Sequence, residues 1–260
     1  AESKVIIREE QKDGWIDVND DWQFLGDDEL VWLSRRDGYQ HLYLMNLDGK
    51  VLRQLTKGNW EVTGVNGINE TGKKIYLTAA KNSPLEREFY SVDFKGKSLK
   101  LISTQNGLTD VNLSPNQHYF INYFSSKDQP QLIDLMETNG KIVRNLRKNS
   151  TEKFSNWNLG KKELLTFKLD DGTVLNGYMI KPSNFDANKK YPVMMFQYSG
   201  PGSQQVKNSF SFGVTDRFHH YLAQQEIIVF CADGRGTGFR GRAFEQITNH
   251  DLGAYETADQ

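Results

Sequence analysis

The sequence predicts two parts of different fold class, an all-β region of propeller blades followed by an α/β region. Three turn glycines, Gly49, Gly96 and Gly140, recur 47 and 44 residues apart among short β-type segments. Further along, two apolar segments, 191–197 and 227–233, enclose a stretch of helix length, and each runs into a glycine-rich turn. Between these patterns the composition changes from short aromatic and β-branched runs to longer apolar strands.

The blade prediction comes from the repeat. Each repeat contains two strands with two-residue alternation, joined by a polar turn and followed by a tight turn that contains the glycine. A strand-turn-strand-turn-strand unit at this period is typical of a propeller blade, although a plain β-meander or a sandwich is the alternative. The paired segments are 30–34 with 41–47, 74–78 with 88–93, and 119–123 with 131–135.

The blades are too few to close a ring. Propellers have roughly four to eight blades, whereas residues 1–155 supply about three and a flanking strand. Open outermost blades would also leave unpaired strand edges. We therefore expect residues 1–155 to be the C-terminal part of a propeller in a longer polypeptide.

The α/β part opens with segments 163–169 and 174–182, a hairpin around an Asp-Gly turn. The sheet is expected to start antiparallel and then turn parallel, because two apolar strands of the buried type follow. Between these two strands, Asp216 is a candidate N-cap for a helix over 217–225. Another helix is expected to begin near Asp251 or Leu252.

This pattern is typical of the first crossover of an α/β-hydrolase sheet, and we assign residues 156–260 to the N-terminal part of such a domain. In that fold, the turn after the earlier strand supplies half of the oxyanion hole. No Gly-x-Ser-x-Gly nucleophile elbow occurs up to Gln260. Ser199 and Ser203 lie near the turn but outside any elbow, so we do not expect either to be the nucleophile.

Composition excludes several classes of function. Charged residues make up 25% of the chain and the net charge is −1, so no nucleic-acid or other polyanionic partner is expected. No apolar run approaches the roughly 20 residues that a spanning helix needs. The first four residues lack the features of a secretory signal. The single cysteine, Cys231, lies in an apolar strand and is expected to be a small buried hydrophobe.

Two further patterns resemble functional sites but are expected to be structural. The segment 233–238 is rich in glycine, yet its order does not match a phosphate-binding loop, so a turn with Arg235 or Asp233 in a local salt bridge is favoured. No histidine follows a nucleophile, and the adjacent pair on the predicted helix has poor spacing for a metal. Surface or partly packed positions are expected for His41, His118, His219, His220 and His250.

Several sequence blocks resemble the dipeptidyl peptidase IV family, serine peptidases of the prolyl oligopeptidase group. The blocks cover nearly the whole chain in the expected order. They are Tyr-Pro at 191–192, Tyr-Ser-Gly-Pro-Gly-Ser-Gln at 198–204, Asp-Gly-Arg-Gly-Thr-Gly at 233–238, residues 252–260, and the blade segments 38–43 and 58–65.

The resemblance implies a fold and an activity for a longer polypeptide. An eight-bladed propeller would cap the hydrolase domain, with the active site between them. The activity would be release of N-terminal dipeptides, after proline or alanine, from peptides with a free N-terminus. A serine, a histidine and an aspartate beyond Gln260 would carry the reaction, so the isolated chain is expected to be inactive. The resemblance implies no metal or organic cofactor. Because family members are commonly dimeric and often extracytoplasmic, it also suggests a homodimer with a periplasmic or secreted location.

Two residues are candidates for the site by the same resemblance. The family places a tyrosine like Tyr198 with its hydroxyl facing the scissile carbonyl, where a protonated phenol can stabilise the oxyanion. Without the resemblance, a strand-end tyrosine that merely packs is the simpler interpretation. Trp22 is a candidate for contact with substrate, although the local match is loose and a buried blade tryptophan is favoured.

Two alternatives to a dipeptidyl peptidase remain open. One is a non-catalytic interaction protein, a propeller beside a hydrolase-like domain that has lost its serine. The other is a related oligopeptidase that cuts internally or removes blocked residues. A nucleophile elbow after Gln260 would favour the peptidase, whereas a replaced serine there would favour the interaction protein. An acidic pair that binds the free amine, in earlier blades, would distinguish the dipeptidyl peptidase from the oligopeptidase.

Overall fold

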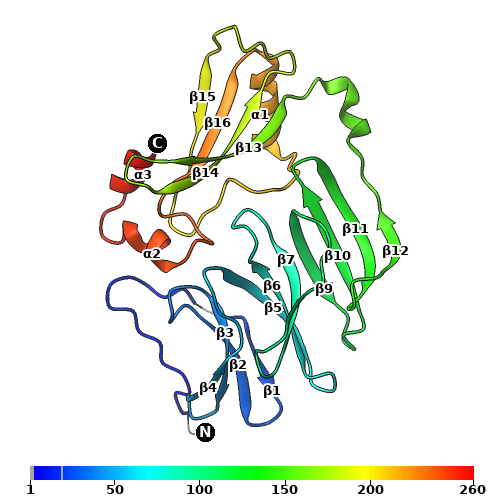
Figure 1. The fold of residues 1–260 in the computed structure, drawn as a ribbon, viewed down its shortest axis with the longest axis vertical. Helices are drawn as coiled ribbons and strands as arrows, with labels where there is room; N and C mark the ends of the chain where they lie inside the picture. Colours follow the sequence, from blue (N-terminus) through cyan, green and yellow to red (C-terminus); the bar gives the residue numbers. More distant parts are fainter. Residues whose placement is uncertain (1–2, 19) are drawn as a thin grey trace.

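The computed structural model describes residues 3–18 and 20–260, and its first part consists of three antiparallel sheets of four strands each (Figure 1). Within each sheet the strands follow one another in chain order. The strands are β1 (Trp22–Leu25), β2 (Glu29–Ser34), β3 (His41–Asn46) and β4 (Val51–Gln54); β5 (Glu61–Asn69), β6 (Lys74–Ala80), β7 (Glu88–Asp93) and β8 (Leu99–Leu101); and β9 (Leu108–Leu113), β10 (Tyr119–Ser126), β11 (Gln129–Glu137) and β12 (Ile142–Arg147).

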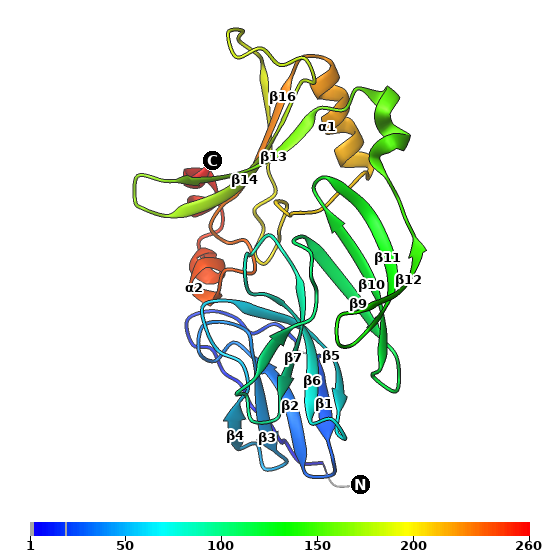
Figure 2. The same cartoon turned by 45° about the vertical axis from the view of Figure 1, so that its right-hand side comes forward.

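Successive sheets lie next to one another in chain order, as blades do (Figure 2). Strand β1 contacts β5, and β9 contacts both β5 and β7. Val31, Leu42 and Ile75 are fully buried in a core shared by the first two sheets. Phe89 packs on Phe120, with ring centroids 4.9 Å apart, and so joins the second sheet to the third. The blade prediction is therefore confirmed.

The repeated glycines close the outer hairpin of each blade. Gly49, Gly96 and Gly140 have φ angles of 77°, 67° and 97°, a region that residues with a β-carbon rarely adopt. Their amides donate to the carbonyls of Asn46, Asp93 and Glu137 at 3.0, 2.9 and 2.8 Å. The same turn thus occurs three times, which explains the period read from the sequence.

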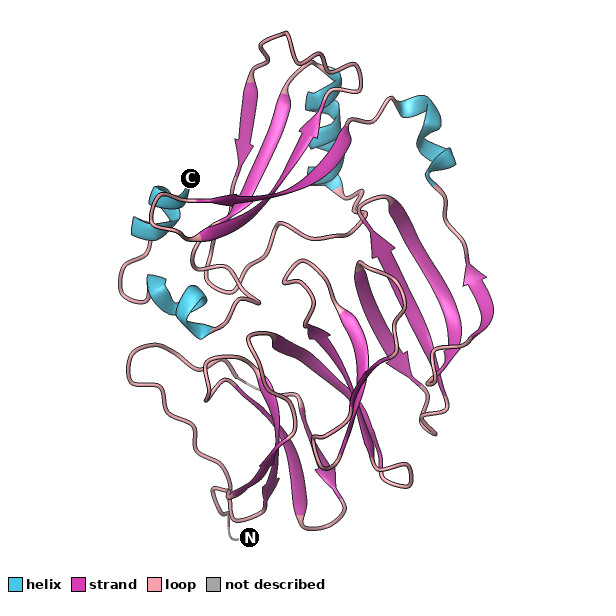
Figure 3. Cartoon of the chain, in the orientation of Figure 1, coloured by secondary structure: helices cyan, strands magenta, loops and turns pink. Residues whose placement is uncertain are grey.

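The second part is a mixed four-stranded sheet with one long helix against it (Figure 3). It follows a 3-10 helix, η1 (Thr151–Trp157), within which the expected domain boundary at residue 155 falls. The sheet order is β13-β14-β16-β15, antiparallel except for the parallel pair β15/β16. The elements are β13 (Lys161–Lys168), β14 (Val174–Lys181), β15 (Val193–Phe196), α1 (Val214–Gln224), β16 (Ile228–Asp233), α2 (Arg242–Glu245), η2 (Gln246–Thr248) and α3 (Ala254–Asp259).

The crossover from β15 through α1 to the parallel β16 confirms the hydrolase-type α/β start, and buried Cys231 lies in β16 as expected. Three details differ. Helix α1 starts at Val214 with Gly213 as N-cap, so Asp216 is not the cap; its carboxylate accepts the Ser211 hydroxyl at 2.6 Å. Strand β15 is an edge strand, and it is not of the buried type. The short helix α2 was not predicted.

Candidate active site

Tyr198 lies two residues beyond the end of β15 and is 65% exposed. Its hydroxyl makes no hydrogen bond within the described part of the chain. Ser199 follows with a positive φ of 39°, and a β-carbon at Gly200 would lie 3.1 Å from the Tyr198 ring. Because Gly200 has no β-carbon, the Tyr198 ring can lie close to the backbone of the turn while its hydroxyl end remains exposed.

The two glycine-rich turns identified in the sequence pack against each other. The Gly202 amide donates to the Gly236 carbonyl at 2.9 Å, and the Gly238 amide donates to the Ser203 carbonyl at 2.9 Å. A β-carbon at Gly238 would lie only 2.7 Å from the Gly202 carbonyl oxygen. Glycine is therefore required at this position by the close approach of two backbones.

Asp233, at the end of β16, holds the chain that follows the Tyr198 turn. Its carboxylate accepts the amides of Gln205, at 3.0 Å, and Val206, at 2.8 Å. Burial raises the pKa of Asp233, while these two amides oppose the shift. Arg235 pairs with Asp259, its Nε lying 2.9 Å from Oδ1, and with Asp171 at 2.8 Å. The segment 233–238 is therefore a structural turn with a local salt bridge, as expected.

The second blade reaches the same turn, a contact that the sequence did not predict. Arg87 Nη2 donates to Gln204 Oε1 at 2.8 Å, and Gln204 Nε2 donates to the Pro84 carbonyl at 2.7 Å. The Arg87 guanidinium also lies over the Phe239 ring, 3.6 Å from its centroid. Burial lowers the pKa of Arg87 to about 10, opposed by Glu61 and Glu88.

The first blade is joined to α2 by a buried ionic cluster. Arg35 lies 2.9 Å from Glu245 and 3.3 Å from Glu61, whose side chains are 3% and 2% exposed. The contact with Glu245 is an ion pair without an aligned hydrogen bond. Burial raises the pKa of both glutamates, and Arg35 opposes the shift. Asp17, more exposed, lies 3.6 Å from Arg35.

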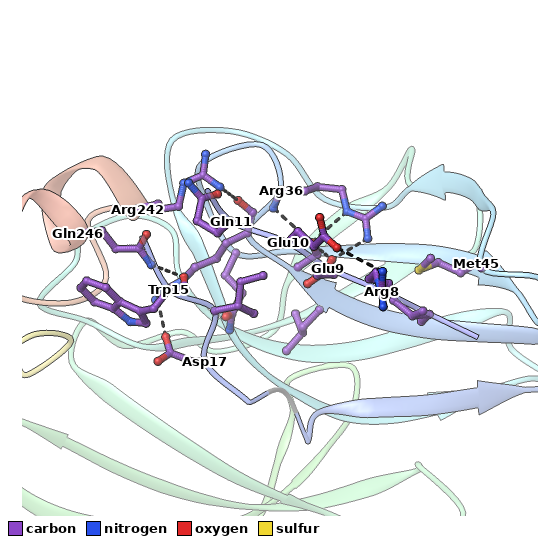
Figure 4. Close-up of a pocket in the computed structure, with 17 residues that line it drawn as sticks. Arg8, Glu9, Glu10, Gln11, Trp15, Asp17, Arg36, Met45, Arg242 and Gln246 are labelled. Atoms are coloured by element: carbon purple, nitrogen blue, oxygen red, sulfur yellow. Dashed lines mark hydrogen bonds and ion pairs between the residues drawn. The ribbon is translucent and has the colours of Figure 1, made fainter. Parts of the chain in front are cut away.

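The segment 3–18 crosses the same blade and contacts η2, while the blade itself contacts α2 (Figure 4). Gln246 donates to the Trp15 carbonyl at 2.7 Å, and Arg242 donates to the Arg35 carbonyl at 3.3 Å. A cavity of about 290 Å³ lies between this segment and the blade. Tyr198 does not line it, so the cavity is separate from the candidate oxyanion site.

Trp22 is 45% exposed, so the favoured interpretation of a buried blade tryptophan is wrong. It lies in β1, where its ring meets Phe24 edge to face at 5.5 Å. Phe24 is exposed as well, because both side chains are on the same face of the strand. Contact of Trp22 with substrate stays a prediction.

Two histidines are more buried than expected. His41 is fully buried and lies within hydrogen-bond distance of Thr56, at 3.0 Å, and of the Gly58 carbonyl, at 2.9 Å. His219 is buried on α1, 3.2 Å from the Tyr178 hydroxyl. Burial lowers the pKa of both rings.

Within residues 3–18 and 20–260, no group of three or more His, Cys, Asp or Glu side chains could hold a metal ion, and no helix is long and apolar enough to span a membrane.

Comparison with known proteins identifies the family. The model for the dipeptidyl peptidase IV N-terminal region matches residues 1–131, and that for the prolyl oligopeptidase family matches residues 214–260. The chain is 32% identical over 271 residues to dipeptidyl peptidase 4 of Arthroderma otae, covering 100% of this chain and 35% of the relative. Identity to dipeptidyl peptidase 4 of Trichophyton equinum is 30% over 271 residues, with 100% and 35% covered.

Solved structures agree with the sequence comparison. The crystal structure of Porphyromonas gingivalis dipeptidyl peptidase 4 superposes with a TM-score of 0.84 and 34% identity, over 92% of this chain and 34% of that one. The chain thus spans roughly a third of the length of the relatives that it matches. By sequence and by fold, it belongs to the dipeptidyl peptidase IV family.

Proposed function

We propose that this chain is part of a serine exopeptidase that releases dipeptides, after proline or alanine, from peptides with a free N-terminus. The observation that carries the proposal is the position of Tyr198: an exposed phenol with an unpaired hydroxyl, on a turn held from both sides, in a chain of this family. A donor fixed in this way can meet an oxygen that becomes negative during acyl transfer.

In the proposed reaction a serine from the remainder of the hydrolase region attacks the peptide carbonyl. A histidine, oriented by an aspartate, takes the serine proton and passes it to the leaving amine. Tyr198 donates its hydroxyl hydrogen bond to the oxyanion together with a backbone amide. Water then hydrolyses the acyl-enzyme and releases the dipeptide. A homodimer, and a periplasmic or secreted location, are part of the same proposal.

Two alternatives compete with this proposal. A non-catalytic interaction protein would keep the propeller surface but lack the serine, and a related oligopeptidase would accept peptides with a blocked N-terminus. A chromogenic Gly-Pro substrate with a free amine and the same substrate with an acetylated amine distinguish the three. The exopeptidase cleaves only the free form, the oligopeptidase cleaves the blocked form, and the interaction protein cleaves neither.

The role of Tyr198 is tested in the full-length enzyme with Tyr198→Phe, which removes only the hydroxyl. We expect kcat to fall about a hundred- to a thousand-fold, since that is the usual effect of losing one oxyanion donor. Tyr221→Phe is the matched control, because Tyr221 is 55% exposed on α1 and lies outside the turn. Equal kcat for the two variants would exclude Tyr198 from the reaction. The 260-residue chain alone is expected to give no turnover.

A further inference from the structure

The position of Tyr198 depends on contacts from outside its own domain. Within the hydrolase region the turn is held by backbone hydrogen bonds to Gly236 and Gly238 and by the carboxylate of Asp233. These contacts hold it from the side of β16. On the other side, residues 204–208 are contacted by the loop between β6 and β7 of the second blade, and Asn208 also accepts the Lys127 amide of the third blade at 3.0 Å.

Arg87 is the residue of that loop that reaches both glycine-rich turns. It donates to Gln204 in the turn after β15 and stacks over Phe239, next to Gly238 in the turn after β16. The guanidinium is fixed on its own loop as well, because Nη1 donates to the carbonyls of Pro84, at 3.0 Å, and Glu86, at 2.7 Å. A planar group with several fixed donors is a rigid link between the loop and the turns.

A shift at Gln204 would pass directly to Tyr198. The Ser203 amide donates to the Gly200 carbonyl at 2.9 Å, which closes a tight turn between the two residues. Pro201 restricts the backbone inside that turn. Only this closed turn separates Gln204 from Tyr198 and Ser199, so we expect a shift at Gln204 to displace Tyr198 as well.

We propose that Arg87 is a positioning residue of the propeller, which holds the Tyr198 hydroxyl in place for the oxyanion through Gln204 and Phe239. The inference rests on the proposed function. It implies that fast acyl transfer requires contact between the second blade and the Tyr198 turn. It also assigns to Arg87 an effect on kcat without any contact with substrate. A small displacement of a catalytic donor can lower the rate up to about a hundred-fold.

The test is a double-mutant cycle in the full-length enzyme, with Arg87→Met and Tyr198→Phe, alone and together. With Tyr198 present, Arg87→Met should lower kcat about ten- to a hundred-fold and change KM less than about twofold. With Tyr198→Phe already present, it should lower kcat less than about twofold, because the donor that it positions is gone. Arg87→Lys should resemble Arg87→Met, since an ammonium cannot hold the turn and stack on the ring together.

Arg53→Met is the matched control. Arg53 also donates to a carbonyl of the neighbouring blade, that of Phe94 at 2.7 Å, but it is exposed and lies away from the turn. It should leave kcat within twofold in both backgrounds, on the order of experimental error. Hydrogen exchange gives a second measurement: the Gly202 and Val206 amides should exchange about tenfold faster in Arg87→Met than in Arg53→Met.

The outcomes separate the inference from the proposed function. Equal losses of kcat for Arg87→Met in both backgrounds, or no loss in either, would overturn the inference while leaving the peptidase intact. A full-length protein without turnover would refute the proposed function, and hydrogen exchange alone would then decide whether Arg87 holds the turn. Unchanged exchange at Gly202 and Val206 would overturn the inference in that case as well.

Discussion

Replacing Arg35 with methionine should expose the cost of the buried charge cluster between the first blade and α2. Arg35 is the cation that faces both Glu61 and Glu245, whose side chains are 2% and 3% exposed. Removing it leaves two buried carboxylates, with exposed Asp17 and the more distant Arg87 as the remaining charges that face them. Breaking a buried ion pair from one side typically costs about 3–5 kcal/mol of unfolding free energy.

The loss should depend on pH. Burial raises the folded-state pKa of each glutamate above its ordinary value of 4.5, so protonation favours the folded form. The cost of keeping either carboxylate ionised is absent below the ordinary value and complete above the raised one. Without Arg35 the folded-state pKa rises further. The difference in unfolding free energy between the wild type and Arg35→Met should therefore be largest near pH 8 and smaller near pH 5.

Urea unfolding followed by tryptophan fluorescence at the two pH values measures this difference. Arg8→Met is the control, since the Arg8–Glu10 pair has side chains 78% and 67% exposed and should contribute little. A loss for Arg35→Met that is no larger than for Arg8→Met, or one that does not change between pH 8 and pH 5, would refute the reasoning about desolvated carboxylates.

Two further substitutions test packing. Phe89→Ala should lower the unfolding free energy by about 3–5 kcal/mol, because the ring is fully buried between the second and third blades; calorimetry should show a lower Tm, and an unchanged Tm would contradict the shared core. Gly238→Ala should destabilise the protein by about 1–3 kcal/mol, because its methyl group would meet the Gly202 carbonyl. Urea titration measures this loss, and an unchanged midpoint would contradict the close approach of the two backbones.

The blades could be predicted because their determinants are local. A hairpin glycine with positive φ is needed wherever a strand pair must close tightly, and Gly49, Gly96 and Gly140 mark those points in the sequence itself. Two-residue alternation fixes the strands between them, and β7 has the predicted bounds, Glu88–Asp93. The parallel pair was predictable for the same reason, since a helix-length segment separates β15 from β16.

The burial of individual side chains and the contacts between distant residues could not be predicted from local sequence. Arg87 and Gln204 are 117 residues apart, and nothing in either local sequence indicates the other. His41 and Trp22 show the same limit. The histidine is buried in the blade, where its ring nitrogens lie within hydrogen-bond distance of the Thr56 hydroxyl and the Gly58 carbonyl, whereas the tryptophan is exposed on β1, an edge strand of the first sheet. Residue type sets the cost of burial, but neighbours from other elements determine whether it occurs.

The contacts around Tyr198 also explain why its turn has few side chains of its own to hold it. Gly200 leaves room for the Tyr198 ring and Gly202 adopts a positive φ of 71°, but neither residue has a side chain that could anchor the turn. Stability must then come from groups that approach from elsewhere. Asp233 supplies it from the sheet and Arg87 from the propeller. The turn is thus held by groups from both domains. If Tyr198 is the oxyanion donor, as proposed, contact between the two domains therefore contributes to the placement of its hydroxyl.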